Sequence, residues 1–399
     1  MIERAENDPG ARVIADSTRR GSTDAAPSDA SQTAPHPARL RYIDALRGLA
    51  ALLVVWIHVA NCYDALSPET AAHSYWLNDF ITQIDIGRVG VVLFFLISGF
   101  VIPFSMRADG AAPVVPFAIK RFFRIFPAYW VSVPAGALTS WWMWGGEFGA
   151  RDFFVNLTLL QNVFDVKSAQ ELYWTLLVEL VFYAICVLLF LAKSLFVPRR
   201  IGSVVAFLML IYAGLMVLHW LRWPIANANL ANWLLNISVM LWGAMYRGWT
   251  SSQSRDPVAR WLIWGLLAGF VVILPLGTVL TIGVAHNVLL AYAIGFLVFL
   301  GGTTILRIES NVGDWLGSIS YSVYLFHPVV FLPIYYGLLH LPSDSQLRHQ
   351  NLAVYLAVNI VLTLILATMI FRLVERPGIR IGRRLAARYE VRAAAANAA

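Results

Sequence analysis

The segment RYIDALRGLAALLVVWIH, residues 41–58, decides the fold class, because it is a long apolar run broken by only a few ionisable side chains. Extended to Cys62, it has the length of about 20 residues that an α-helix needs to cross some 30 Å of hydrocarbon. Its apolar residues are continuous and do not alternate with polar ones, so a strand of a membrane β-barrel is disfavoured. We therefore expect a membrane-spanning helix here.

The same pattern recurs along the chain. Of the 399 residues, 59% are hydrophobic and 13% are charged, against about 45–50% and 25% in ordinary soluble proteins. This composition excludes a soluble enzyme and a disordered chain, and two cysteines are too few for a secreted disulfide scaffold. The sequence predicts an all-α polytopic membrane protein, a bundle of about ten transmembrane helices centred on residues 45–62, 90–105, 125–143, 172–192, 201–220, 230–246, 261–280, 288–303, 316–338 and 352–371.

Lys and Arg are concentrated on one side of the predicted bundle. With the N-terminus placed in the cytoplasm, 25 of the 30 Lys and Arg fall in cytoplasmic segments and five fall in outer loops. An excess of positive charge marks the cytoplasmic face of a membrane protein, so we expect both termini to be cytoplasmic. The net charge of +7 is explained in the same way, and nucleic-acid binding is not expected.

The two ends of the chain differ from its middle. Residues 1–40 are rich in Ala, Ser, Thr, Asp, Arg and Pro and contain no sustained apolar run. Such a segment cannot bury enough apolar surface to fold alone. We expect three parts: a disordered cytoplasmic tail at 1–40, a transmembrane domain at 41–380 and a cytoplasmic C-terminal tail at 381–399.

The first predicted span contains ionisable side chains, which are costly in hydrocarbon and therefore indicate function. Arg47 and His58 are eleven residues apart, which places them on nearly the same helix face and about 16 Å apart along the axis. This arrangement combines an anion-binding cation with a candidate general base. Asp44 is expected to pair with the Arg47 guanidinium. The alternative is structural, with Arg47 reaching lipid headgroups and His58 bonded to a neighbouring helix.

A second group of cations lies at the start of the third predicted span, in KRFFRIFPAYW (residues 120–130). Arg121 and Arg124 are three residues apart and share a helix face, and their expected depth is close to that of Arg47. Grouped guanidinium ions suit a polyanion such as a phosphorylated cofactor. A charge cluster in contact with lipid phosphates is the alternative.

The fourth predicted span contains the motif WTLLVELVFY (residues 174–183), with one carboxylate, Glu179. Counted from the outer ends of their spans, Glu179 and His58 lie at similar depths, roughly 10 Å and 8 Å. A carboxylate beside a histidine would orient the imidazole and raise its basicity. Otherwise Glu179 would be protonated and bonded to another helix.

Three further motifs contain polar or small residues. FFLISGF (residues 94–100) places Ser98 and Gly99 within a span, which is typical of close helix packing. SYSVYLFHP (residues 320–328) places His327 before a proline, and a structural hydrogen bond is favoured for it over a functional role. Glu375 is expected to form an ion pair or cap at the end of the last span. No metal-binding or nucleotide-binding motif is present.

Taken in order, these motifs resemble those of acyltransferase family 3, integral-membrane O-acyltransferases that modify bacterial surface polysaccharides and some macrolides. The resemblance covers about residues 39–380. Its most specific element is Arg47 and His58 with ten residues between them, followed by FFLISGF, RFFR, WTLLVELVFY, SYSVYLFHP and VERP.

The resemblance implies a bacterial cytoplasmic (inner) membrane enzyme with an acyl-CoA donor, commonly acetyl-CoA, bound from the cytoplasm. The acyl group would pass to a hydroxyl of a carbohydrate or glycoconjugate at the other side. A homo-oligomer is compatible with this function, and no metal is implied. By position, His58 would be the essential catalytic histidine with Arg47 as its companion, and Arg121 and Arg124 would bind the donor. Glu179 matches an acidic position of the family. The supporting residues would be Asp44, Ser98, Trp174, Tyr183 and His327.

Two mechanisms fit this interpretation. His58 would act as a general base in direct transfer, or its imidazole would be acylated first. The alternative function is a proton-coupled secondary transporter of a sugar or lipid intermediate, because buried His, Arg and Glu also form proton pathways. A structural membrane scaffold is the third candidate function.

Overall fold

The structure is a computed structural model that describes residues 40–63, 66, 83–106, 113–223, 228–251, 256–282 and 286–398. The chain divides into two units, Met1–Arg39 and Leu40–Ala399, and all described residues belong to the second. The predicted disordered tail at 1–40 therefore lies outside the described residues, except for Leu40.

Helices account for all regular secondary structure in the described part of the chain. Each predicted apolar block falls on a helix: α1 (Arg41–Tyr63), α4 (Ile86–Ser105), α5 (Val114–Ser140), α7 (Tyr173–Leu191), α8 (Pro198–Trp220), α9 (Ala228–Ser251), α10 (Pro257–Ile282), α11 (His286–Thr304), α12 (Asn311–Leu339) and α13 (Leu352–Ile370). Short helices form in the connections: η2 (Trp142–Trp144), α6 (Ala150–Asn156) and η3 (Gln346–Arg348).

Seven helices of the described residues are long and apolar enough to cross a membrane, so the chain is a multi-pass membrane protein, but ten spans are not confirmed. The helices α5, α9 and α10 are outside this set. In α5 the reason lies in its composition. Lys120, Arg121 and Arg124 occupy its first half, and polar and aromatic residues lower the hydropathy of its second half.

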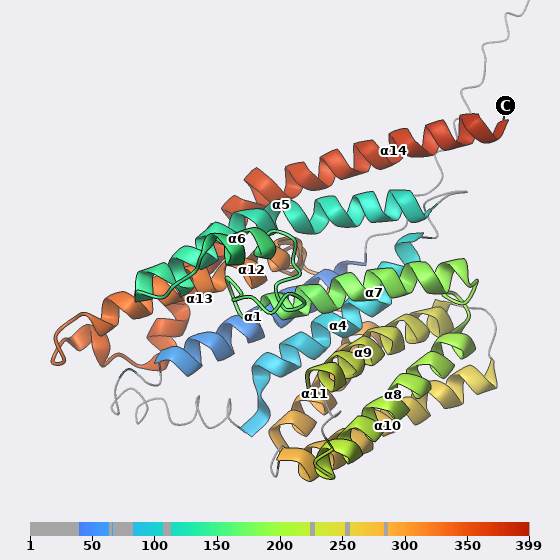
Figure 1. Cartoon of the computed structure of the whole chain (residues 1–399), viewed down its shortest axis with the longest axis horizontal. Coiled ribbons are helices and arrows are strands. Elements are labelled where there is room, and N and C mark those ends of the chain that lie inside the picture. The colour runs from blue at the N-terminus through green and yellow to red at the C-terminus, as the bar shows by residue number, and fades with distance from the viewer. Residues whose placement is uncertain are drawn as a thin grey trace, which may run out of the picture. The chain divides into compact units, whose positions relative to one another are not determined.

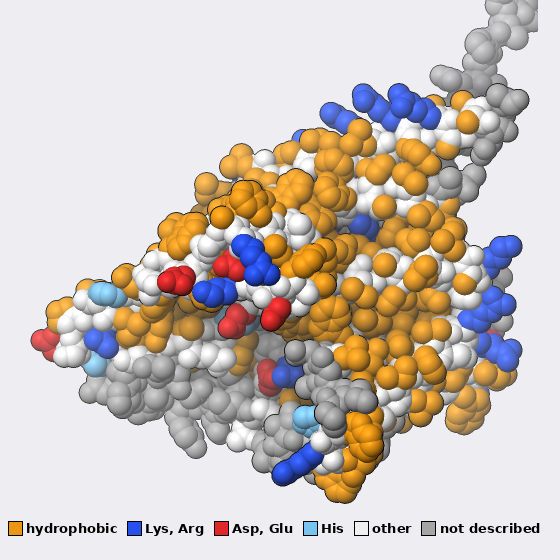
Figure 2. All heavy atoms as spheres, viewed as in Figure 1, with side chains coloured by type: hydrophobic (Ala, Val, Ile, Leu, Met, Phe, Trp, Pro, Cys, Tyr) orange, Lys and Arg blue, Asp and Glu red, His pale blue; other side chains and the backbone are white. Residues whose placement is uncertain are grey.

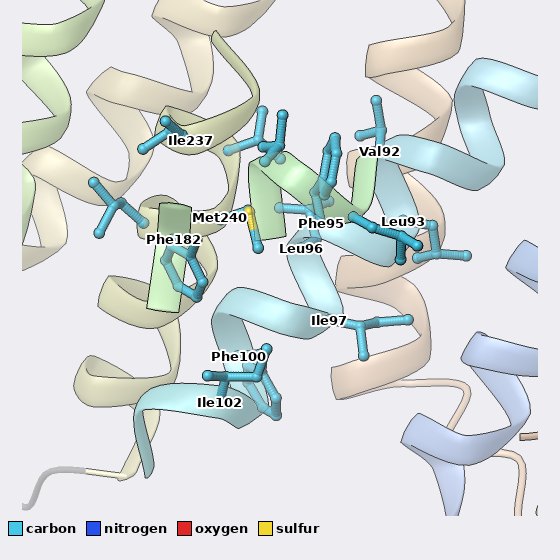
Figure 3. Packing of buried hydrophobic residues seen from close by; sticks show 14 of the residues in the cluster. Val92, Leu93, Phe95, Leu96, Ile97, Phe100, Ile102, Phe182, Ile237 and Met240 are labelled. Carbon is cyan, nitrogen blue, oxygen red and sulfur yellow. The ribbon is translucent and has the colours of Figure 1, made fainter. Parts of the chain in front are cut away.

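The helices α1 and α4 lie at the centre of the bundle (Figure 1). The helix α1 packs against α4 and α12, while α4 also packs against α9 and α11. The pair α8 and α9 extends the bundle on one side together with α10. Side chains from α4, α7 and α9 fill the space between these helices, as Figure 3 shows for Phe95, Leu96, Phe182 and Met240.

Glycines allow two of these crossings to be very close. A β-carbon added at Gly99 of α4 would lie 1.8 Å from the carbonyl oxygen of Met240 in α9. A β-carbon added at Gly317 of α12 would lie 2.3 Å from the carbonyl oxygen of Asp44 in α1. The prediction that Ser98 and Gly99 mark close helix packing is confirmed for Gly99.

The last predicted span continues beyond the expected apolar block. After α13 the chain makes one π-helical turn, η4 (Phe371–Glu375), and continues as α14 (Arg376–Ala398), so residue 380, the expected end of the domain, falls inside a helix. The helix α14 packs along α5, where Gly378 and Gly382 contact Pro127 and Phe123. Figure 2 shows Lys and Arg gathered over α14, beside a surface that is largely hydrophobic.

Candidate active site

A cavity of about 100 Å³ lies between α1, α4, α5, α7 and α12, and it brings three arginines together. Arg47 comes from α1, and Arg121 and Arg124 come from α5. We call this cavity the arginine pocket; its lining also includes Val91, Phe94, Phe95, Ser98, Ile102, Ile125, Thr175, Leu176, Glu179, Tyr183, Ser320, Tyr321 and Tyr324. The structure thus places the three predicted anion-binding residues at one site.

The arginines of this pocket are held to different degrees. Arg121 donates a hydrogen bond to Ser105 Oγ at 2.9 Å and lies over the rings of Phe117 and Tyr183. Arg124 forms an ion pair with Glu375 of the π-helical turn. Among the described residues Arg47 makes no direct hydrogen bond or ion pair, although the charges of Asp44 and Glu179 act on it. Arg47 is therefore the guanidinium most available to a ligand.

Glu375 is the buried partner that positions Arg124. Its side chain is 0% exposed, and its second oxygen accepts a hydrogen bond from Ser322 Oγ at 2.6 Å. A buried carboxylate is stable when it is paired and hydrogen-bonded. The sequence predicted an ion pair or cap at Glu375, but the partner is 251 residues away in the chain.

Glu179 lies in the arginine pocket and not beside His58. It accepts a hydrogen bond from Tyr183 at 2.7 Å. No hydrogen bond or ion pair joins Glu179 to His58 among the described residues. The predicted contact between the two residues was therefore wrong. The two residues have similar depths in their helices, but depth does not specify which neighbour a side chain faces.

The partner of His58 is His327 of α12. The distance between His58 Nδ1 and His327 Nε2 is 3.0 Å, and the ring centroids are 5.0 Å apart. His327 Nδ1 lies 2.7 Å from the carbonyl oxygen of Tyr324. His327 is 0% exposed and His58 is half-buried. The sequence favoured a structural hydrogen bond for His327 and counted it among the supporting residues; the structure places it directly against His58.

These contacts fix the proton positions in the neutral histidine pair. A carbonyl oxygen can only accept, so His327 Nδ1 carries a hydrogen and its Nε2 has a free lone pair. His58 Nδ1 lies near this lone pair and 2.9 Å from the carbonyl oxygen of Val54, so it must donate. His58 Nε2 is then the unprotonated nitrogen, which is the form that a general base requires.

One layer of side chains separates the histidine pair from the arginine pocket. Phe94, Thr175 and Tyr324 are among the residues that line the pocket, and His58 is not part of its lining. Tyr324 Oη and Thr175 Oγ1 are 2.6 Å apart, and the Phe94 ring packs edge-on against Tyr324. The same Tyr324 supplies the carbonyl that orients His327, so it contacts both parts of the site.

The remaining predicted supporting residues occupy different places. Ser98 lines the arginine pocket directly. Trp174 packs edge-on against Phe95, which lines the pocket. Asp44 is buried where α1 meets Gly317 of α12. In the described ranges, no three His, Cys, Asp or Glu side chains are grouped so that they could hold a metal ion.

Comparison with known proteins gives the same family over nearly all of the described bundle. A family model described as an acyltransferase domain matches residues 40–372. The exopolysaccharide production protein ExoZ of Rhizobium meliloti (strain 1021) is 29% identical over 276 residues, which is 61% of this chain and 77% of that protein. The putative membrane-bound transacylase BcsY of Komagataeibacter xylinus is 26% identical over 374 residues, covering 86% of this chain and 83% of that protein.

No solved structure matches the chain. The family model, however, covers far more than half of the sequence, and it includes Arg47, His58, Arg121, Arg124, Glu179 and His327. The chain therefore belongs to the membrane acyltransferases of family 3.

Proposed function

We propose that this protein transfers an acyl group, most simply acetyl, from acyl-CoA in the cytoplasm to a hydroxyl of a carbohydrate at the opposite side of the cytoplasmic membrane. The observation that carries this proposal is the histidine pair, because it leaves His58 Nε2 unprotonated next to a pocket of three arginines. The excess of Lys and Arg supports the orientation with the arginine pocket towards the cytoplasm.

The arginine pocket suits the phosphate end of the donor. Phosphate groups of CoA cannot enter hydrocarbon, whereas guanidinium groups bind phosphate with two parallel hydrogen bonds. The pocket follows α4 from Val91 to Ile102, which is about 16 Å along the helix. A pantetheine arm has a comparable length, so the thioester would approach the layer formed by Phe94, Thr175 and Tyr324.

The relatives support the acceptor class. One of them is named for exopolysaccharide production and the other for transacylase activity. A polysaccharide or a lipid-linked sugar precursor supplies the hydroxyl that acyl transfer requires. We therefore assign the acceptor to the carbohydrate class.

The proposed reaction is a direct transfer. His58 Nε2 removes the proton from the acceptor hydroxyl while the hydroxyl oxygen forms a bond to the thioester carbonyl carbon. The carbon–sulfur bond then breaks, and the sulfur leaves with the proton returned from His58, which yields an ester and free CoA. His327 accepts the hydrogen bond from His58 Nδ1 throughout and holds the ring in this tautomer.

The test uses the full chain purified into lipid nanodiscs with acetyl-CoA and a hydroxylated acceptor such as a short polysaccharide fragment. Free CoA thiol and acceptor ester are measured together. His58→Gln should lower turnover by about 10²–10⁴-fold, which is the usual contribution of a general base. His219→Gln, a histidine at the end of α8, is the matched control and should retain activity.

The outcomes separate this function from the alternatives. A secondary transporter would leave the thioester intact in every variant. A scaffold would show neither reaction nor dependence on His58. Full turnover by a folded His58→Gln protein would refute the proposed reaction, and an acylated His58 trapped without acceptor would replace direct transfer by the acyl-histidine route.

A further inference from the structure

A second cavity, of about 280 Å³, lies between the ends of α1, α4, α9 and α11. The helix α4 stands between the two cavities, because Phe100 lines this one while Ser98 and Ile102 line the arginine pocket. The cavity contains two arginines and several hydroxyl groups; its lining residues are Tyr42, Phe100, Tyr246, Arg247, Thr250, Ser251, Thr303, Thr304 and Arg307.

Aromatic rings hold Arg247 in place, and its guanidinium has N–H donors that make no hydrogen bond to a described residue. Its guanidinium carbon lies 4.7 Å from the centre of the Phe100 ring and 5.6 Å from that of Phe104. Stacking of this kind orients a guanidinium and leaves its N–H edge free. The Nε atom is buried, and among the described residues it has no hydrogen-bond partner. A buried donor without a partner is destabilising, so its presence here points to a ligand that accepts its hydrogen bond.

Arg307 faces the same cavity from the segment that follows α11. Its Nε donates to the carbonyl oxygen of Thr303 at 2.9 Å, and its guanidinium lies 5.3 Å from the centre of the Tyr42 ring. These contacts leave the terminal nitrogens available to an acceptor. None of the described lining residues is Asp or Glu, so the two positive charges have no counter-ion in the cavity lining.

The hydroxyl groups narrow the class of ligand. Ser251 Oγ donates to the carbonyl of Arg247 at 2.6 Å, and Thr304 Oγ1 donates to the carbonyl of Leu300 at 2.6 Å. Their protons are therefore used within their own helices, and their oxygens remain as acceptors. The cavity thus offers guanidinium donors for an oxyanion and hydroxyl acceptors for a hydroxyl of the same ligand.

We propose that Arg247 and Arg307 form a second anion site that binds a phosphate ester of a small polyol, such as glycerol phosphate. The guanidinium groups would bind the phosphate oxygens, and the hydroxyl oxygens of α9 and α11 would accept from the polyol. This chemistry occurs in the headgroup of an anionic phospholipid and in a soluble polyol phosphate. The proposal does not depend on the acyl-transfer reaction, because this site shares no residue with the arginine pocket.

The experiment compares the two sources on the purified full chain. Native mass spectrometry measures retention of phosphatidylglycerol against phosphatidylcholine, and titration calorimetry in phosphatidylcholine nanodiscs measures glycerol 3-phosphate. The double variant Arg247→Gln/Arg307→Gln should lose at least about tenfold in affinity for the bound probe, as expected when two charge-assisted contacts are removed. Arg260→Gln, an exposed arginine at the start of α10, is the matched control.

The outcomes decide both the site and the source. Loss of phosphatidylglycerol retention in the double variant supports a lipid ligand, and loss of glycerol 3-phosphate binding supports a soluble one. Arg247→Lys/Arg307→Lys keeps the charge for folding and should bind more weakly than the unchanged chain, because lysine lacks the guanidinium fork. The proposal is overturned if the wild-type protein binds neither phosphatidylglycerol nor glycerol 3-phosphate. It is also overturned if the double glutamine variant binds the probe with the same affinity as Arg260→Gln.

Discussion

His327 is the residue whose role changed most between sequence and structure. It accepts a hydrogen bond from His58 at 3.0 Å and is itself oriented by the Tyr324 carbonyl. Because the Val54 carbonyl also lies within reach of His58 Nδ1, losing His327 weakens the orientation of His58 and does not abolish it.

We therefore expect His327→Leu to lower kcat by about 10-fold to 100-fold, less than the loss of the base itself, with little change in the KM for acetyl-CoA. His327→Gln supplies an amide oxygen as acceptor and should recover part of the rate. Steady-state kinetics on the purified protein measures this split. An increase in KM with unchanged kcat would contradict the orienting role.

Replacing Glu375, the partner of Arg124 in the arginine pocket, is expected to change KM more than kcat. Its replacement by Gln removes the charge that holds Arg124, and breaking a buried ion pair costs about 3–5 kcal/mol of stability. The donor should then bind more weakly, so the KM for acetyl-CoA rises more than kcat falls. Ser322→Ala is the control: it removes one hydrogen bond to Glu375, worth about 1 kcal/mol, and should leave the KM near its original value.

The sequence could indicate these residues but not their partners. Helical spacing placed Arg121 and Arg124 on one face and Arg47 near the same depth, and the structure brings all three to one pocket. The pairs His58–His327 and Arg124–Glu375 join residues 269 and 251 positions apart. Contacts of this kind depend on how helices are arranged around one another, which periodicity within one helix does not specify.

At the scale of helices, the crossing of α4 and α9 is a sensitive point. Gly99→Ala would force a methyl group against the Met240 carbonyl oxygen, and overpacking of this kind costs about 1–3 kcal/mol. The melting temperature in detergent should fall. Gly214→Ala in α8 is the control, because a β-carbon there would meet no atom within 4 Å; equal melting temperatures would show that the crossing can relax.

Hydropathy predicted where the helices lie along the chain. It did not predict where each helix ends or how many of them are long and apolar enough to span the membrane. Apolar blocks identify α1, α4 and α12 well, since each of these helices contains a long apolar stretch with few charged residues. The helix α14 was not foreseen, because its residues are too polar to form a span and it owes its position to packing along α5. Composition alone cannot reveal a helix that is stabilised by a neighbour.

For the whole molecule, the distribution of charge predicts the orientation in the membrane. Asp344 precedes α13, and Ala394 lies near the end of α14, so the two positions are near opposite ends of the helical run that these helices form. In a chain whose native cysteines are replaced by serine, a membrane-impermeant maleimide should label Asp344→Cys in intact spheroplasts and Ala394→Cys only after permeabilisation. The reverse pattern would place the arginine pocket outside and exclude a cytoplasmic donor.

The π-helical turn joins α13 and α14 into a helical run of 45 residues, Leu352–Ala396, about 68 Å long at 1.5 Å per residue. This length is more than twice the thickness of the hydrocarbon layer. Glu375, which holds Arg124, lies at the turn in the middle of this run. Because the Arg124–Glu375 ion pair ties the middle of this run to α5, a change in the angle between α13 and α14 would move Glu375 and, with it, Arg124 of the arginine pocket.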